Sequence, residues 1–209
     1  MNNFETFDNL FQLSALTIML LAAGGWGMKL QSRKLVVLAC GYGSFILGLL
    51  FYMLHLAIIG DIPRVFYVSE SSWLAGYLFF LFLVTLREDR QNLCFKAVPA
   101  VLAVLTVAAA VYNEVMGGSV LMSLTFGVIA GFIVYISAVR IHRAKSQRTV
   151  PSPFDIAMVV IVIFQNLVYF LSGYVTDYTR FNVYFAADIL LTLTLCSLLL
   201  FLKKEVQQR

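Results

Sequence analysis

The sequence predicts an all-α membrane protein with seven transmembrane helices, and three observations lead to this fold class. The 209 residues are 61% hydrophobic and 12% charged, whereas soluble domains are about 45 to 50% apolar and about 25% charged. The apolar residues form seven continuous runs, each near the roughly 20 residues that a helix needs to cross a bilayer. The basic residues are concentrated in alternate loops. We therefore expect contact with a lipid bilayer along most of the chain.

The predicted spans, in chain order, cover residues 10–28, 35–59, 67–86, 95–116, 120–139, 154–175 and 182–202. Acidic Glu5 and Asp8, rather than a basic segment, precede the first run, so we interpret it as a retained span and not as a cleaved signal peptide. The second and fifth runs contain small residues at spacings that favour close helix packing, namely Gly41, Gly43, Ser44 and Gly48, and 127–131. Packing within the chain is expected there, with a dimer interface as the alternative.

The orientation follows from the basic residues, which cytoplasmic loops retain in excess. Thirteen of the fifteen lysines and arginines fall after the first, third, fifth and seventh spans, and only Arg64 and Arg180 fall on the other side. This distribution predicts an outer N-terminus and a cytoplasmic C-terminus in the plasma (cytoplasmic) membrane. The net charge of +4 is then the sum of a basic inner face and an acidic outer face. It gives no indication of nucleic-acid binding.

An internal repeat is centred on the pattern Asp-x-x-Arg, which occurs as Asp61 to Arg64 and as Asp177 to Arg180. Its flanks match at a shift of 117 residues. We expect each pattern to form an outer cap, in which acids at the mouth of the bundle hold the arginine.

The repeat predicts two related halves joined by a linker helix, in a three-one-three parallel arrangement. The expected single domain covers residues 1–209, with half 1 at about 10–90, the linker at about 95–116 and half 2 at about 120–205. Parallel repeats of this kind place a central site between the two halves.

Asp188 is the strongest candidate for a functional residue. It precedes Lys203 by fifteen residues, which places it about 22 Å above the inner boundary at a rise of about 1.5 Å per residue. An ionisable group inside the hydrocarbon is costly and indicates a functional site. The alternative is a structural acid that pairs with an arginine or is held neutral by burial.

Other polar and aromatic residues are predicted at a similar depth on four spans, and we expect them to converge on one pocket that opens outward. With Asp188, the candidate ligand-binding residues are Tyr184, Glu70, Trp73, Tyr77, His55, Asn166, Tyr169 and Gln165. Alternatives exist for several of them: aromatic anchors at the interface, interhelical contacts for Gln165 and Asn166, and a solvated surface histidine for His55. In contrast, the inner half of the bundle is expected to be nearly featureless.

Motifs for enzymes and cofactors are missing from the sequence. There is no His-x-x-x-His, Gly-x-Ser-x-Gly, Gly-rich phosphate loop or Cys-x-x-Cys, and the cysteines Cys40, Cys94 and Cys196 are not spaced as metal ligands. We therefore expect no enzymatic activity, no metal and no cofactor. A hydrolase that uses Asp188 and Glu70 inside the membrane is left open.

Two resemblances bear on function. The stretch from Glu70 through Trp73 and Gly76 to Tyr77 and Phe80 resembles a segment of the seven-helix sensor domains of bacterial signalling proteins, in which a kinase or cyclase domain usually follows. Because this chain stops at Arg209, the resemblance implies output through a signalling partner. The three-one-three plan is similar to that of SWEET-type sugar transporters, although their Pro-Gln motif is absent.

These observations together predict a membrane protein that binds a small polar or cationic ligand in an acidic pocket facing outward. Sensing through a membrane or cytoplasmic partner is the favoured use, because the inner half shows no polar path. A small-solute transporter and a structural or assembly subunit of a membrane complex are the alternatives.

Overall fold

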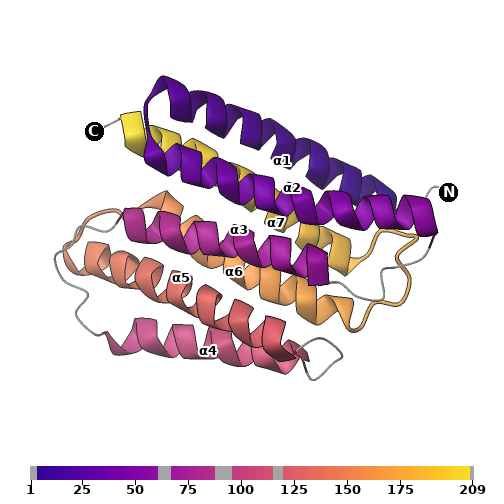
Figure 1. Cartoon of the computed structure of the whole chain (residues 1–209). Helices are drawn as coiled ribbons and strands as arrows, with labels where there is room; N and C mark the ends of the chain where they lie inside the picture. The colour runs from indigo at the N-terminus through magenta and orange to yellow at the C-terminus, as the bar shows by residue number, and fades with distance from the viewer. Residues whose placement is uncertain (1–3, 61–66, 88–95, 115–119, 208–209) are drawn as a thin grey trace.

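The computed structural model describes residues 4–60, 67–87, 96–114 and 120–207 of the chain. Within these ranges the chain forms seven α-helices and no strand, as predicted. The helices are α1 (Phe4–Lys29), α2 (Arg33–Ile59), α3 (Tyr67–Leu86), α4 (Ala97–Glu114), α5 (Val120–Ser146), α6 (Pro153–Ser172) and α7 (Val183–Gln207). They run back and forth along one bundle axis, and the two chain ends lie at opposite ends of the bundle (Figure 1).

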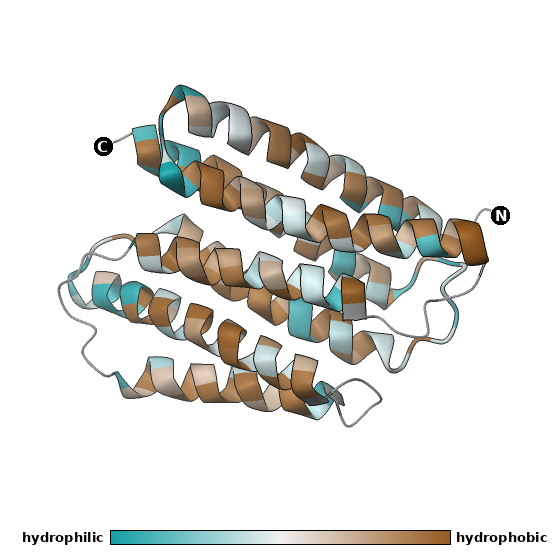
Figure 2. Cartoon of the chain, in the orientation of Figure 1, coloured by the Kyte–Doolittle hydropathy of each residue, from teal (hydrophilic) through white to brown (hydrophobic). Residues whose placement is uncertain are grey.

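Six of these helices are long and apolar enough to cross a membrane, and α4 is shorter. Hydrophobic residues cover most of the length of each helix, and hydrophilic residues gather towards the helix ends (Figure 2). The chain is therefore a multi-pass membrane protein. The expected seventh span corresponds to α4, which has 18 residues.

The helix bounds differ from the predicted spans mainly where polar residues flank an apolar run. The first helix begins at Phe4 and so includes Glu5 and Asp8, which precede the predicted span. At their other ends, α5 and α7 continue through basic residues to Ser146 and Gln207. The hydropathy of a run marks the hydrocarbon boundary, whereas the backbone hydrogen bonds of a helix continue into the polar interface.

The six longer helices form a closed ring in the order α1, α2, α3, α5, α6 and α7. Neighbours in this order pack against each other, and α2 also contacts α7. The shorter helix α4 packs outside the ring against α5 and α6 (Figure 1).

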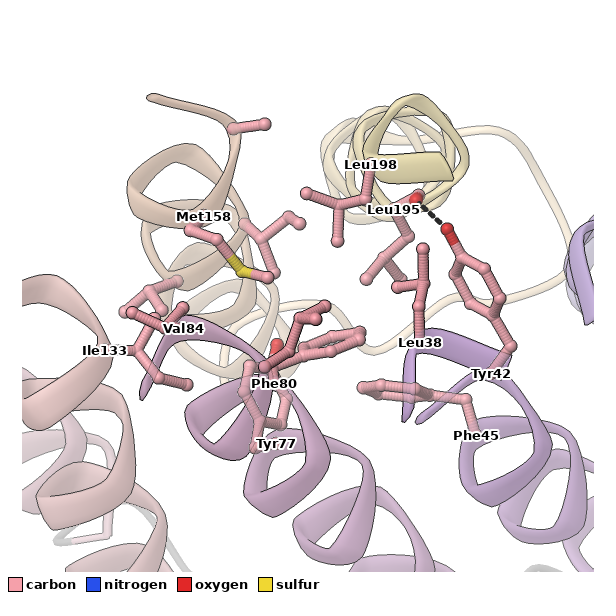
Figure 3. Close-up of a cluster of buried hydrophobic side chains, with 14 of the residues drawn as sticks. Leu38, Tyr42, Phe45, Tyr77, Phe80, Val84, Ile133, Met158, Leu195 and Leu198 are labelled. Atoms are coloured by element: carbon pink, nitrogen blue, oxygen red, sulfur yellow. Dashed lines mark hydrogen bonds between the residues drawn. The ribbon is translucent and has the colours of Figure 1, made fainter. Parts of the chain in front are cut away.

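Aromatic and aliphatic side chains fill the middle of the ring (Figure 3). Phe80 is fully buried, and Phe45 packs on both Phe80 and Tyr77 with ring centroids 5.6 and 5.5 Å apart. Tyr42 is also fully buried, and its hydroxyl donates a hydrogen bond of 2.7 Å to the backbone carbonyl of Leu195. This bond joins α2 to α7 and satisfies a polar atom that would be costly to bury alone.

Glycines allow the closest helix contacts. A Cβ at Gly41 would lie 2.9 Å from the Phe80 ring, and one at Gly76 would lie 2.6 Å from the Phe45 ring. The absence of a side chain at both positions therefore lets α2 and α3 pack closely. In α5, a Cβ at Gly127 would lie 3.0 Å from Ala110 of α4. The expectation that the small residues pack within the chain is confirmed for Gly41 and Gly127.

The bundle has two chemically different ends. At one end, which we call the acidic end, α1, α3 and α7 begin; the opposite end, where α2 and α6 begin, is the basic end. At the acidic end, the backbone amides of Phe4 and Glu5 donate hydrogen bonds to the carbonyls of Thr179 and Tyr178. The segment between α6 and α7 thereby caps the first turn of α1, whose amides have no partner within the helix.

Candidate ligand-binding cavity

A cavity of about 370 Å³ lies at the acidic end of the ring. Residues of α1, α2, α3, α6 and α7 and of the segment before α7 form its walls. They are Glu5, Asp8, Asn9, Gln12, Phe45, Leu49, Tyr52, Glu70, Trp73, Gln165, Val168, Tyr169, Ser172, Tyr178, Tyr184, Phe185 and Asp188. Its volume is within the range of about 300 to 1,000 Å³ that is typical of small-molecule sites.

The charge of the cavity is strongly asymmetric. Four carboxylic acids, Glu5, Asp8, Glu70 and Asp188, contribute to its walls, and no basic side chain does so among the residues that the structure describes. Aromatic rings form much of the remaining surface. This combination favours a cation, because carboxylates attract the charge and aromatic faces stabilise it further.

Six of the nine predicted ligand-binding residues line this cavity. They are Asp188, Tyr184, Glu70, Trp73, Tyr169 and Gln165. A seventh, Tyr77, is 1% exposed and lies behind the wall, where its hydroxyl donates a hydrogen bond of 2.8 Å to Oε1 of Gln165. The structure thus brings side chains of α3, α6 and α7 to one place.

The other two predicted residues are not among those that line the cavity. His55 lies towards the end of α2 that is at the acidic end of the bundle, with its ring 6.1 Å from that of Phe51. The side-chain amide of Asn166 donates to the carbonyl of Val162 in its own helix, and its backbone carbonyl accepts a hydrogen bond from Asn113 of α4. Asn166 therefore contributes to the contact between α4 and α6.

One polar feature of the cavity is a pair of carboxyl groups from the two ends of the chain. Asp8 on α1 and Asp188 on α7 both line the cavity and lie next to each other, and Gln12 lies beside Asp188. Asp8 is only 2% exposed, and its Oδ1 atom has no hydrogen-bond partner among the described residues. A buried acceptor without a donor costs about 1 to 3 kcal/mol.

A second carboxyl group is held by an aromatic residue nearer the end of the bundle. The hydroxyl of Tyr52 on α2 donates a hydrogen bond of 2.6 Å to Oε1 of Glu5 on α1. On α3, Trp73 reaches the cavity because Gly48 of α2 leaves room for it: a Cβ at position 48 would lie 2.7 Å from the indole nitrogen. The shape of the wall therefore depends on how closely α2 approaches α3.

The predicted outer caps are described only in the second half, because Asp61 and Arg64 lie outside the described residues. In the second half, Oδ1 of Asp177 accepts hydrogen bonds from the hydroxyl and the backbone amide of Thr179, at 2.6 and 2.9 Å. These bonds, with a smaller contribution from the charge of Arg180, lower the pKa of the Asp177 carboxyl. Asp177 thus shapes the turn that caps α1.

The contribution of α1 to the cavity was not predicted. Glu5 and Asp8 precede the first predicted span, and Gln12 was not among the candidate residues. A spacing of four residues puts Asp8 and Gln12 on the same face of a helix. A first helix predicted to start earlier would therefore have shown a polar face formed by these two residues. The pairing of Asp8 with Asp188 has no local signal.

The expectation of a nearly featureless inner half was wrong, because a buried ion network lies at the basic end. Arg87, which follows α3, donates a hydrogen bond of 2.8 Å to Asp155 of α6 and one of 2.9 Å to Glu205 of α7. Arg140 of α5 donates to the same Asp155 oxygen at 3.2 Å and to the carbonyl of Val84 of α3 at 2.8 Å. The side chains of Arg87 and Asp155 are 6% and 3% exposed.

This network could have been suspected from one feature of the sequence. Asp155 lies at the start of an apolar run, directly after a basic loop, where a lone acid is expected to pair with a neighbouring base. The network holds α3, α5, α6 and α7 together where the cytoplasmic boundary is predicted.

No group of three or more histidine, cysteine, aspartate or glutamate residues that could hold a metal ion occurs in the described part of the chain. The comparisons with known proteins give no relative: no protein-family model, curated protein or solved structure matches this chain.

Proposed function

We propose that this membrane protein is a receptor-like sensor that binds a small polar or cationic ligand in the cavity at the acidic end and acts through a partner protein. The observation that carries the proposal is the composition of the cavity wall, in which four acids and several aromatic rings face about 370 Å³ of space. The positive-inside distribution of basic residues supports an outward-facing acidic end. The ligand would then arrive from outside the cell.

The packing below the cavity favours sensing over transport. Phe80, Leu83 and Leu198 are fully buried, and the network of Arg87 and Asp155 joins four helices at the opposite end. A solute would have to separate both the buried apolar side chains and the ion network in order to pass. A ligand that shifts the helices around the cavity could instead alter the basic end, where a cytoplasmic partner has access.

Transport remains the second candidate because of the order of helices in the ring. Exchanging α1, α2 and α3 with α5, α6 and α7 converts every neighbouring pair in the ring into another neighbouring pair. Such an arrangement is expected of a parallel three-one-three repeat, and transporters built from repeats use it to open a central site to each side in turn.

A thermal-shift screen of the purified protein against polar and cationic metabolites tests the proposal. A ligand that binds only the native state raises the free energy of unfolding, by about 2.7 kcal/mol at a ligand concentration of 100 times its Kd. The unfolding midpoint rises as a result. The same ligand should stabilise an Asp188→Asn variant less, whereas Lys145→Met, at an exposed position on the basic side, should respond like the wild type. A screen without a stabilising ligand, or equal responses of all three proteins, would contradict the proposal.

Radiolabelled uptake into proteoliposomes separates the two candidates. A ligand that binds but does not accumulate supports the sensor, and saturable uptake supports the transporter.

A further inference from the structure

The contact between Asp8 and Asp188 has a simple chemical requirement. An ionised carboxylate has acceptor atoms but no donor, so two carboxyl groups form a hydrogen bond only when they share a proton. Here the two groups come from α1 and α7, line the same cavity and lie next to each other, with Gln12 beside Asp188. Two neighbouring carboxyl groups in a buried wall repel each other when both are ionised, which favours sharing one proton between them. The pair in the empty cavity would then carry a net charge of −1.

The second feature is an oxygen atom of the pair that accepts no hydrogen bond from the described residues. Asp8 lines the cavity and is 98% buried, since its exposed fraction is 2%, and its Oδ1 has no hydrogen-bond partner among the described residues. Nearly all buried polar atoms in proteins have a partner. Oδ1 is itself covered by neighbouring atoms, but the Asp8 carboxyl group belongs to the cavity wall. A ligand with an N–H or O–H donor that reaches this carboxyl group therefore supplies a hydrogen bond that the empty protein lacks.

The groups that face the pair from the neighbouring helices add acceptors and aromatic surface but no positive charge in the described part of the wall. They are Glu5 on α1, Tyr52 on α2, Glu70 and Tyr77 on α3, Tyr169 on α6, Tyr178 before α7 and Tyr184 on α7. Tyr52 already donates to Glu5, and Tyr77 to Gln165. The positive charge that would balance two ionised carboxylates must therefore come from the ligand.

We propose that the ligand is a primary amine whose ammonium group binds between Asp8 and Asp188 and displaces the proton that they share. This inference rests on the proposed ligand-binding function and specifies its ligand class. The ammonium ion enters with its charge, the O–H bond of the shared carboxyl breaks, and the proton leaves to solvent. Two ionised carboxylates and one ammonium then carry the same net charge of −1 as the empty pair.

The geometry distinguishes a primary amine from other cations. A metal ion is disfavoured because the described residues contain no cluster of three acidic or histidine ligands. A quaternary ammonium ion has charge but no N–H group, so it donates no hydrogen bond to either carboxylate. A primary ammonium has three donors, enough for both carboxylates, and the surrounding rings of Trp73 and Tyr184 suit its carbon chain.

Isothermal titration calorimetry of the wild-type protein tests the inference without any mutation. The probes are a panel of primary amines that includes phenethylamine, together with the N,N,N-trimethyl derivative of phenethylamine and 2-phenylethanol. Titrations in buffers of different ionisation enthalpy give the number of protons released on binding. We expect about one proton per bound amine, binding at least tenfold weaker for the trimethyl derivative, and no proton release with the alcohol.

The pH dependence gives a second readout. Because one proton competes with the ammonium, the apparent affinity should rise about tenfold per pH unit over the range in which the pair retains its proton. In Asp8→Asn an amide replaces one carboxyl group, so no proton is shared, and both the release and the steep pH dependence should disappear. Lys145→Met is the control, since Lys145 is exposed at the basic end and outside the cavity wall, and it should behave like the wild type.

The possible failures are distinguishable. Binding of the amine without proton release would overturn the exchange, as would equal affinity for the trimethyl derivative. If no amine binds while another metabolite stabilises the protein, the ligand class is wrong and the proposed receptor function stands. If no ligand of any kind stabilises the protein, the proposed function fails as well.

Discussion

At the scale of single residues, Tyr77 and Gln165 show how a buried polar contact supports the cavity from behind. The Tyr77 hydroxyl is the donor to Oε1 of Gln165, and both residues are buried. Tyr77 itself is not among the residues that line the cavity, whereas Gln165 is. The hydrogen bond therefore orients the Gln165 amide in the cavity wall.

Replacing Tyr77 by phenylalanine should destabilise the protein by about 1 to 3 kcal/mol, because it leaves a buried acceptor without its donor. Equilibrium unfolding in detergent measures this change. Adding Gln165→Leu should restore much of the loss, since removal of both partners leaves no unsatisfied group. Tyr112→Phe, at a residue that is 53% exposed, is the control and should have little effect. A Tyr77→Phe variant with the stability of the wild type would argue against the hydrogen bond.

The turn at Asp177 gives a prediction about pH outside the membrane. Hydrogen bonds from the Thr179 hydroxyl and then from its amide lower the pKa of Asp177 below its ordinary value of 3.8. With a lowered pKa, the contribution of the turn to stability is fully present above that ordinary value and is lost as the pH falls through the lowered one. NMR titration of the Asp177 carboxyl group measures this directly. Thr179→Ala should shift the pKa back upwards, and a wild-type pKa at or above 3.8 would contradict the assignment.

At the scale of helices, the approach of α2 to α3 depends on Gly48. A Cβ there would meet the Trp73 indole at 2.7 Å and the Ser69 carbonyl oxygen at 3.0 Å. The backbone atom cannot move away alone, so Gly48→Ala should displace α3, cost about 1 to 3 kcal/mol and weaken ligand binding. Gly24→Ala is the matched control, because no atom lies within 4 Å of its Cβ and alanine favours a helix by about 0.5 to 1 kcal/mol. Equal unfolding midpoints of the two variants would refute this packing.

The ion network at the basic end joins helices in a different way. Asp155 accepts hydrogen bonds from both Arg87 and Arg140 through one oxygen, and the guanidinium carbon of Arg87 lies 4.1 Å from the centre of the Phe154 ring. Asp155 is thus the common partner of two arginines that belong to different parts of the chain.

Asp155→Asn should destabilise the protein by about 3 kcal/mol, because removing one partner of a buried pair leaves the remaining charges uncompensated. Thermal unfolding in detergent provides the measurement. An exposed lysine on the same side, Lys145, should tolerate replacement by methionine, since exposed charges contribute about 0 to 1 kcal/mol. If both variants unfold at the same midpoint, the network does not hold the helices together.

For the whole molecule, the orientation in the membrane remains a prediction from the basic residues. A cysteine introduced at Thr176, which is exposed at the acidic end, should react with a membrane-impermeant thiol reagent in intact cells. One at Gln147, exposed after α5 at the basic end, should react only after the cells are opened. The background protein should lack Cys40, Cys94 and Cys196. Labelling of position 147 in intact cells would indicate the opposite orientation, and a ligand would then reach the cavity from the other side of the membrane.

Much of the fold could be predicted because the signals are local. A continuous apolar run of about 20 residues identifies a helix in a membrane without reference to any other part of the chain, and α3 begins and ends at the predicted residues. Helical spacing also placed Glu70, Trp73 and Asp188 at similar depth, and the structure brings all three to one cavity. His55 is near the same level, but the cavity wall does not include it.

The remaining features depended on which helices lie next to each other. Composition and helical periodicity are properties of each segment alone, so they were enough to predict an all-helical membrane protein with an acidic and a basic end. The proximity of Asp8 to Asp188, and the sharing of Asp155 by Arg87 and Arg140, arise only when the helices pack together. These pairs join residues from separate helices, and lipid-facing and buried apolar side chains look the same in a sequence. The physical reason is therefore the relative rotation of the helices in the ring, which determines whether a polar side chain faces a partner, a cavity or lipid.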